Sequence, residues 1–136
     1  MSDDAGDDWL HKLDAQGWLD AARSELHHAD ASYAEGAARA GLAYARRAAG
    51  MALNAALVVR PREWGRTYVE HLRALSGDET APEAVRRACH TLLETTMPGA
   101  SALVTLRRSR ADVTCVEAAR DVIAHAYAIV LKGTDT

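Results

Sequence analysis

The sequence contains no phenylalanine, only three prolines and only two cysteines among its 136 residues. The scarcity of proline, with alanine at about a fifth of all positions, favours long helices. Cys89 and Cys115 have neither the spacing of a CxxC motif nor the density of a disulfide framework. We therefore expect both to be small buried residues of a reduced cytoplasmic protein.

Long apolar runs are also missing. No apolar stretch approaches the roughly 20 residues that a membrane helix needs, so we expect no membrane interaction. The start, MSDDAGDDW, is acidic where a secretory signal would be basic and then apolar. The net charge of −3 argues against a protein that coats nucleic acid without specificity.

What the sequence does contain is apolar and small residues at intervals of three and four. This pattern, in a chain of one-domain length, predicts an all-α, up-and-down bundle of about five helices. We expect an acidic N-terminal tail over 1–16, partly disordered or docked, a helical domain over 17–132 and a C-terminal tail over 133–136. The helices are expected at about 18–32, 35–59, 64–75, 82 to the Pro98-Gly99 break, and 112–131.

Several residues mark helix ends. Pro61 stops the second helix, because the residue before a proline is pushed out of the helical region. Pro82 fits the first turn of the fourth helix, with Thr80 or Ala81 as its cap. Asp112 is expected to cap the last helix.

The second helix contains the stretch YARRAAGMALNAALVV, in which a seam of mostly small residues lets another helix approach closely. The seam consists of Tyr44, Ala48, Met51, Ala55 and Val58. Gly41 and Gly50 are expected to allow the same close contact, which would offset their cost of roughly 1 kcal/mol each relative to alanine.

The core is expected to include large apolar residues from several helices: Leu26, Met51, Leu53, Leu92, Ile123 and Val130. The apolar side of the fourth helix is expected to comprise Val85, Cys89, Leu92, Leu93 and Thr96.

The Ala-rich helix, followed by WGRTYVEHLRAL with the pair His71-Leu72, resembles the HEPN domain, a small all-helical module of prokaryotes. The resemblance covers about 18–131. It implies a homodimer that binds a nucleotide, RNA or a protein partner. Such modules are often encoded beside a minimal nucleotidyltransferase, which implies a partner of that type in a toxin–antitoxin or defence-type regulatory pair.

The last expected helix contains RDVIAHAY, which is similar to the motif of catalytic HEPN ribonucleases, Arg, four to six residues and His, often continued as HxY. This resemblance implies that His125 is the acid/base at the 2′-hydroxyl and that Arg120 holds the scissile phosphate. Tyr127 would complete the motif. The chemistry would need no metal or cofactor, and two motifs would meet across a dimer cleft.

Two observations favour a non-catalytic module instead. The same Arg-to-His spacing occurs twice more, at 23–28 and 66–71, and about two matches are expected by chance. At about 100° per residue, Arg120 falls on a stripe with other, mostly apolar residues, while His125 points almost opposite. That stripe consists of Val116, Arg120, Ile123, Tyr127 and Val130. A metal-independent endoribonuclease that uses Arg120, His125 and Tyr127 stays open as one alternative, and a helical scaffold or interaction protein as another.

The run Arg107-Arg108-Ser109-Arg110 is the candidate nucleotide or RNA site, since arginine forks suit phosphate groups. A solvated loop is the alternative, and the conformation of 99–111 stays open. The adjacent His27 and His28 diverge by about 100° on a helix and do not form a metal face. We expect no metal site and no cofactor.

Overall fold

The computed structural model describes residues 9–96 and 110–134, with the side chains of 110–113 and 134 excepted. The described residues form an all-helical bundle of five α-helices, preceded by one short 3₁₀ turn, as the sequence pattern predicted. The elements are η1 (Leu10–Lys12), α2 (Ala15–Ala34), α3 (Ala38–Val59), α4 (Tyr68–Ser76), α5 (Glu83–Glu94) and α6 (Arg110–Thr134). Arg107, Arg108 and the open segment 99–109 lie outside the described residues, and the side chain of Arg110 does also.

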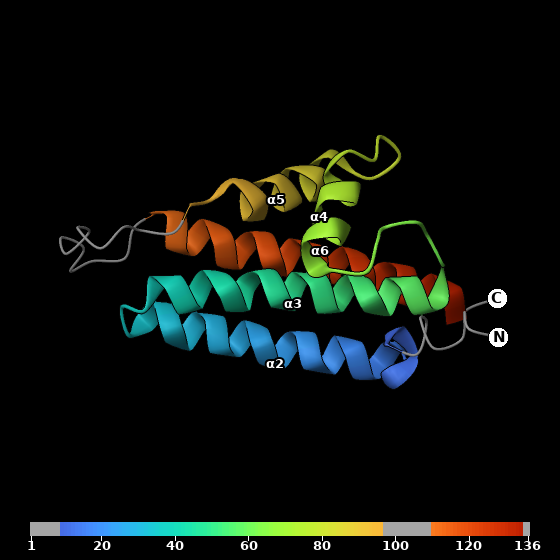
Figure 1. Cartoon of the computed structure of the whole chain (residues 1–136), viewed down its shortest axis with the longest axis horizontal. Coiled ribbons are helices and arrows are strands. Elements are labelled where there is room, and N and C mark those ends of the chain that lie inside the picture. Colours follow the sequence, from blue (N-terminus) through green and yellow to red (C-terminus); the bar gives the residue numbers. More distant parts are fainter. Residues whose placement is uncertain (1–8, 97–109, 135–136) are drawn as a thin grey trace.

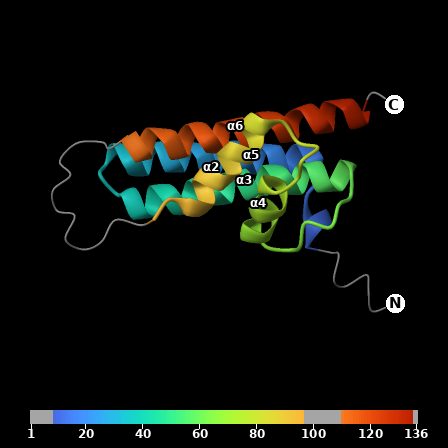
Figure 2. The same ribbon diagram turned by 90° about the horizontal axis from the view of Figure 1, so that it is seen from above.

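The three longest helices, α2, α3 and α6, lie side by side along the long axis of the molecule (Figure 1). The helices α2 and α5 run in one direction, and α3 and α6 run in the other. In the view from above, α5 crosses in front of the long helices, and α4 lies next to it (Figure 2). The central element is α3, which packs against α2, α4, α5, α6 and η1.

The long helices extend beyond their predicted ends. The carboxylate of Asp14 caps α2 by accepting a hydrogen bond from Gly17 N at 2.7 Å, so this helix begins at Ala15 rather than at 18. The helix α6 begins at Arg110, so the prediction of Asp112 as its cap is wrong, and it continues to Thr134 rather than ending near 131. Both helices cross the domain boundaries expected at 16–17 and 132–133.

The other helices begin later than predicted. The left-handed backbone of Gly36 (φ 82°) delays α3 to Ala38 instead of 35. The helix α5 begins at Glu83 after Pro82 and ends at Glu94, before the predicted break at 98–99. Pro82 is the N-cap residue of α5, so the prediction of Thr80 or Ala81 as the cap is wrong, and the Thr80 hydroxyl instead donates to Asp78 Oδ1 at 2.6 Å.

The helix α4 begins at Tyr68 rather than at the predicted position 64, because the backbone of Gly65 is left-handed (φ 80°). Thr67 then caps α4 in a capping box. Its hydroxyl accepts from Glu70 N at 3.1 Å, and the Glu70 carboxylate accepts from Thr67 N at 3.0 Å. The Glu70 carboxylate also accepts from Arg66 N at 2.9 Å, and this bond, together with those from Thr67, holds the pKa of Glu70 below its usual value.

Small buried residues lie on several faces of α3. Close contacts of this helix with its neighbours are therefore not confined to the single predicted seam. Ala48, Ala49, Ala52, Ala55 and Ala56 are all at most 1% exposed. The predicted role of glycine in close contact is confirmed at Gly50, where an added Cβ would lie 2.3 Å from the ring of Tyr68. Gly41 likewise lies under the ring of Tyr33. In both cases a tyrosine ring, rather than a helix backbone, occupies the space.

Arg46 links α3 to the C-terminal end of α5. Its guanidinium donates to the carbonyls of Leu92 at 2.7 Å and Thr95 at 2.9 Å. Carbonyl groups in the last turn of a helix have no partner within the helix, and a positive charge there also offsets the helix dipole. This contact therefore fixes α5 against α3.

The inner face of α6 is lined by small residues. Its fully buried positions are Cys115, Ala119, Val122 and Ala126. The predicted stripe is wrong at two positions: the side chain of Arg120 is 60% exposed, and Tyr127 is 44% exposed. The large apolar residues of that stripe, Val116, Ile123 and Val130, are buried at the edge of this face, at 7–9% exposure.

Four of the six predicted core residues are buried: Leu53, Leu92, Ile123 and Val130. Leu26 and Met51 are only partly buried against the core. On α5, Val85 and Cys89 are buried and Leu93 is partly buried. Thr96 is exposed, since α5 has already ended at Glu94.

His71 is fully buried between α3 and the loop that precedes α4. Its Nδ1 is 3.0 Å from Trp64 O, and its Nε2 is 2.8 Å from Asn54 Oδ1. Burial lowers the pKa of His71, so the neutral ring has one N–H, which donates to Trp64 O. The Asn54 amide nitrogen has no hydrogen-bond partner in this orientation. We therefore assign the flipped Asn54 amide, in which its NH₂ donates to His71 Nε2.

Candidate ligand-binding site

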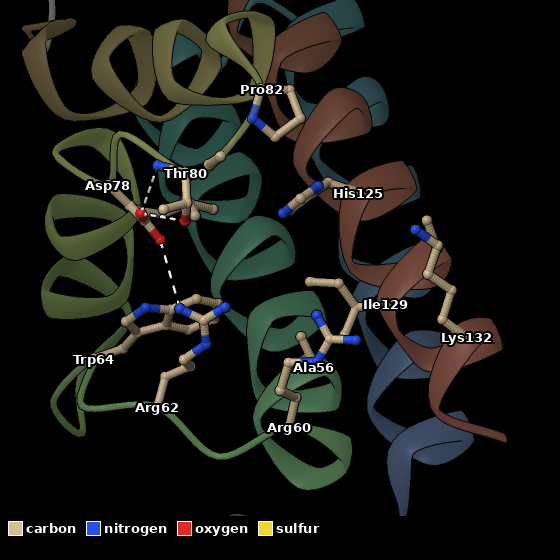
Figure 3. Close-up of a pocket in the computed structure, with 13 residues that line it drawn as sticks. Ala56, Arg60, Arg62, Trp64, Asp78, Thr80, Pro82, His125, Ile129 and Lys132 are labelled. Atoms are coloured by element: carbon tan, nitrogen blue, oxygen red, sulfur yellow. Dashed lines mark hydrogen bonds and ion pairs between the residues drawn. The ribbon is translucent and has the colours of Figure 1, made fainter. Parts of the chain in front are cut away.

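A cavity of about 360 Å³ lies where the C-terminal ends of α3 and α6 meet the loop between α4 and α5 (Figure 3). We call it the α3–α6 cavity. Most of its wall is apolar, and its charged residues are three cations and one carboxylate. It is lined by Ala56, Arg60, Arg62, Trp64, Leu75, Asp78, Thr80, Ala81, Pro82, His125, Ala128, Ile129 and Lys132.

The sequence builds two sides of the cavity from loops. Pro61 follows the end of α3, which leaves Arg60 as its C-cap residue and directs the chain away from the helix axis. Trp64 anchors this loop, because its side chain is buried and its carbonyl accepts from His71. Only the helix-stopping role of Pro61 was predicted.

A turn at Asp78 shapes the opposite side. Asp78 Oδ1 accepts from Thr80 N at 2.9 Å and from Thr80 Oγ1 at 2.6 Å, which holds the pKa of Asp78 below its usual value. Its second oxygen, Oδ2, lies 3.7 Å from Arg62 Nη1. The charge of Arg62 is therefore largely balanced within the cavity wall.

Two further cations border the cavity. Arg60 caps α3 and Lys132 lies in the last turn of α6, where a positive charge offsets the helix dipole. Neither forms an ion pair with another residue in the part of the chain that the structure describes. Figure 3 shows the Arg60 guanidinium close to Ile129 in the cavity. With Asp78 balancing Arg62, these two side chains make the cavity positive.

His125 is the sequence-predicted site residue that lines this cavity. Its ring projects from α6 toward the loop of Thr80 and Pro82 (Figure 3). Burial lowers the pKa of His125, and the nearby charge of Asp78 only partly opposes this effect. The neutral ring makes no hydrogen bond to any other residue within 9–96 or 114–133. It therefore offers one free donor and one free acceptor to the cavity.

The other residues of the ribonuclease-like motif lie elsewhere. Arg120 points toward α2, with its Nη2 4.0 Å from Asp30 Oδ2. Tyr127 is exposed on the surface of α6 and does not line the cavity. The structure thus brings neither residue to His125 within one chain.

The histidines of the two further Arg-to-His pairs have local structural roles. His28 contacts Glu25, whose other oxygen lies 3.1 Å from Arg47 Nε. Glu25 is itself buried between α2 and α3. His71 belongs to the buried network with Trp64 and Asn54.

Most of the residues that line the cavity were not predicted as site residues from the sequence. Arg60 and Arg62 flank Pro61, and this pair of cations at a helix end was a signal that could have been used. Lys132 gave no such signal, because its place in the cavity wall depends on α3 and α6 ending at the same end of the bundle.

No group of three or more His, Cys, Asp or Glu side chains within the described residues is placed to hold a metal ion. None of the described helices combines the length and apolar character that crossing a membrane requires. Comparisons of the chain with protein-family models, with curated proteins and with solved structures gave no match in any of the three.

Proposed function

We propose that this protein is a non-catalytic, HEPN-like binding module whose ligand is an anion held in the α3–α6 cavity. One observation carries this proposal: Arg60 and Lys132, which have no ion pair to a described residue, border a largely apolar cavity into which the unbonded ring of His125 projects. Cations and a hydrogen-bonding group that border an apolar recess are typical of sites for small anionic ligands.

The HEPN resemblance suggests which anions to test first. Nucleotide or RNA phosphate would supply the negative charge, and an acidic segment of a protein partner is the other source. A partner of the nucleotidyltransferase type rests on the resemblance alone. Arg60 would contact the anion through its planar fork and Lys132 through a point charge.

Calorimetric titration with inorganic phosphate, AMP, 1-naphthoate and a short single-stranded RNA would test the proposal. We expect at least one of these anions to bind, and to bind more weakly as salt is raised. The double variant Arg60→Ala/Lys132→Ala should lose this binding. Arg23→Ala/Arg39→Ala removes the same charge from exposed positions on α2 and α3 and should bind normally. Absence of binding by every anion would contradict the proposal.

We also propose that the module dimerises through the outer face of α6. Arg120, Ala124, Tyr127 and Leu131 are all exposed there, at spacings of four, three and four. If two copies cross antiparallel about the midpoint of this face, the large Tyr127 of each copy meets the small Ala124 of the other. The aliphatic part of the Arg120 side chain in one copy then covers Leu131 of the other copy.

Light scattering at about tens of micromolar chain concentration, where weak dimers form, tests this second proposal. The wild-type chain should be a dimer, and Ala124→Glu should be a monomer because it places a charge at the centre of the interface. Ala31→Glu, on the exposed side of α2, is the matched control and should remain a dimer. A monomeric wild-type chain would contradict dimerisation and leave the ligand proposal unaffected.

A further inference from the structure

We propose that the ligand of the α3–α6 cavity is a compact organic carboxylate with an apolar body. This inference rests on the proposed function, because it identifies the chemical class of the anion in the same cavity. It distinguishes a small carboxylate from nucleotide and RNA phosphates.

The walls favour an apolar body. The apolar lining of the cavity includes Leu75, Ala81, Pro82, Ile129 and Trp64. A polar body such as a ribose would lose its hydrogen bonds to water and find few replacements at these side chains. Of the uncharged polar side-chain groups in the wall, the Thr80 hydroxyl already donates to Asp78, which leaves the ring of His125 and the indole N–H of Trp64.

The charged groups in the wall suit an anion with one small charged group. Arg62 is paired with Asp78 and the ring of His125 is neutral, so Arg60 and Lys132 are the lining cations that have no ion pair to a described residue. The planar fork of Arg60 can donate two parallel hydrogen bonds to a carboxylate. Lys132 would add a second, longer-range attraction.

The backbone around the cavity also differs from a phosphate site. Phosphate sites commonly use glycine-rich loops whose backbone N–H groups surround the anion. The residues that line this cavity include no glycine, and Pro82, which precedes α5, has no N–H. Anion recognition here therefore depends on side chains.

The size of the cavity limits the ligand to one small molecule. Ligand pockets usually measure about 300–1,000 Å³, and about 360 Å³ is near the lower end of this range. A molecule the size of a naphthalene ring with one carboxylate matches such a space. An RNA chain could contact only the rim, through Arg60 and Lys132.

Titration of the full chain with 1-naphthoate, 1-naphthamide and AMP would test this inference. The amide has the same apolar body as the carboxylate but no charge. We expect 1-naphthoate to bind at least about tenfold more tightly than either other probe. Arg60→Ala should weaken naphthoate binding about tenfold, whereas Arg39→Ala, at the opposite end of α3, should leave it unchanged.

The remaining outcomes separate this inference from the proposed function. If AMP or RNA binds more tightly than naphthoate and Arg60→Ala abolishes that binding, the carboxylate inference is wrong and the proposed anion site stands. Equal affinities for naphthoate and naphthamide would show an apolar site and overturn the carboxylate inference. If none of the anions binds, both proposals are wrong.

Discussion

Arg120 and His125 lie on different sides of α6, although only five positions separate them. The guanidinium of Arg120 faces Asp30 on α2, and the ring of His125 faces the α3–α6 cavity. A single straight helix cannot direct both groups to one phosphate. A ribonuclease site built from these residues would need the second group from another chain.

The first prediction concerns RNA cleavage. Purified protein should not cleave RNA in the presence of EDTA. Arg120→Ala should change the free energy of unfolding by less than about 0.5 kcal/mol, because the contact of Arg120 with Asp30 is long and exposed. Gel analysis of RNA and urea denaturation measure these two quantities. Metal-free cleavage that disappears in both Arg120→Ala and His125→Ala would establish the endoribonuclease alternative.

The second prediction concerns the buried network of His71. His71→Ala should lower the free energy of unfolding by about 2–4 kcal/mol, because it leaves a cavity and removes the hydrogen-bond partner of Asn54 and Trp64. A double-mutant cycle with Asn54→Ala should give a coupling energy of about 1–3 kcal/mol.

Urea denaturation would supply the four free energies of this cycle. His90→Ala, at an exposed position on α5, is the control and should change stability by less than about 0.5 kcal/mol. Additive effects of His71→Ala and Asn54→Ala would contradict the assigned hydrogen bond between them.

The third prediction concerns Gly50. Gly50→Ala should destabilise the fold, because the new Cβ would overlap the ring of Tyr68, and overpacking usually costs about 1–3 kcal/mol. Gly77→Ala is the matched control, since the nearest atom to an added Cβ there, outside the two adjoining residues, would be Arg73 O at 3.8 Å. Thermal unfolding measured by circular dichroism would compare them. Equal melting temperatures would show that Tyr68 does not fill this space.

The fourth prediction concerns pH. Burial lowers the pKa of His71 and of His125 below 6.5, so the unfolded chain takes up protons before the folded chain does. The free energy of unfolding should therefore fall as pH falls below 6.5. The depressed pKa of Asp78 adds a separate loss only at lower pH, from its ordinary value of 3.8 downward.

Urea denaturation between about pH 7.5 and 5.5 isolates the histidine contribution. In His125→Gln the loss of stability over this interval should be smaller than in the wild-type protein. An unchanged pH dependence in this variant would show that His125 is not buried as described.

The fifth prediction concerns thiol chemistry. Burial raises the pKa of Cys89 to about 12, and Cys115 is also buried, so both thiols should resist a thiol reagent in the folded protein. Both should react fully in denaturant. Rapid reaction of one cysteine under native conditions, measured by mass spectrometry, would show local opening of α5 or α6.

Sequence patterns predicted the helices better than their ends and faces. The centre of the buried face of α6 was predicted wrongly, because the large apolar residues Val116, Ile123 and Val130 were given more weight than the alanines. In this fold α3 approaches so closely that Ala119 and Ala126 occupy the centre of the contact, which turns Arg120 and Tyr127 outward. The start of α4 was predicted too early, because the sequence Gly65-Arg66-Thr67 is compatible with either the first turn of a helix or a capped turn that precedes one.

The sequence by itself determined an all-α chain, since helix propensity and apolar spacing act between residues three or four positions apart. It also determined the end of α3 at Pro61, because proline restricts the residue before it. The direction of the His125 ring and the residues that surround it depend on the tertiary structure. Arg60, Lys132 and His125 line one cavity because packing around α3 brings the ends of two helices and one loop together.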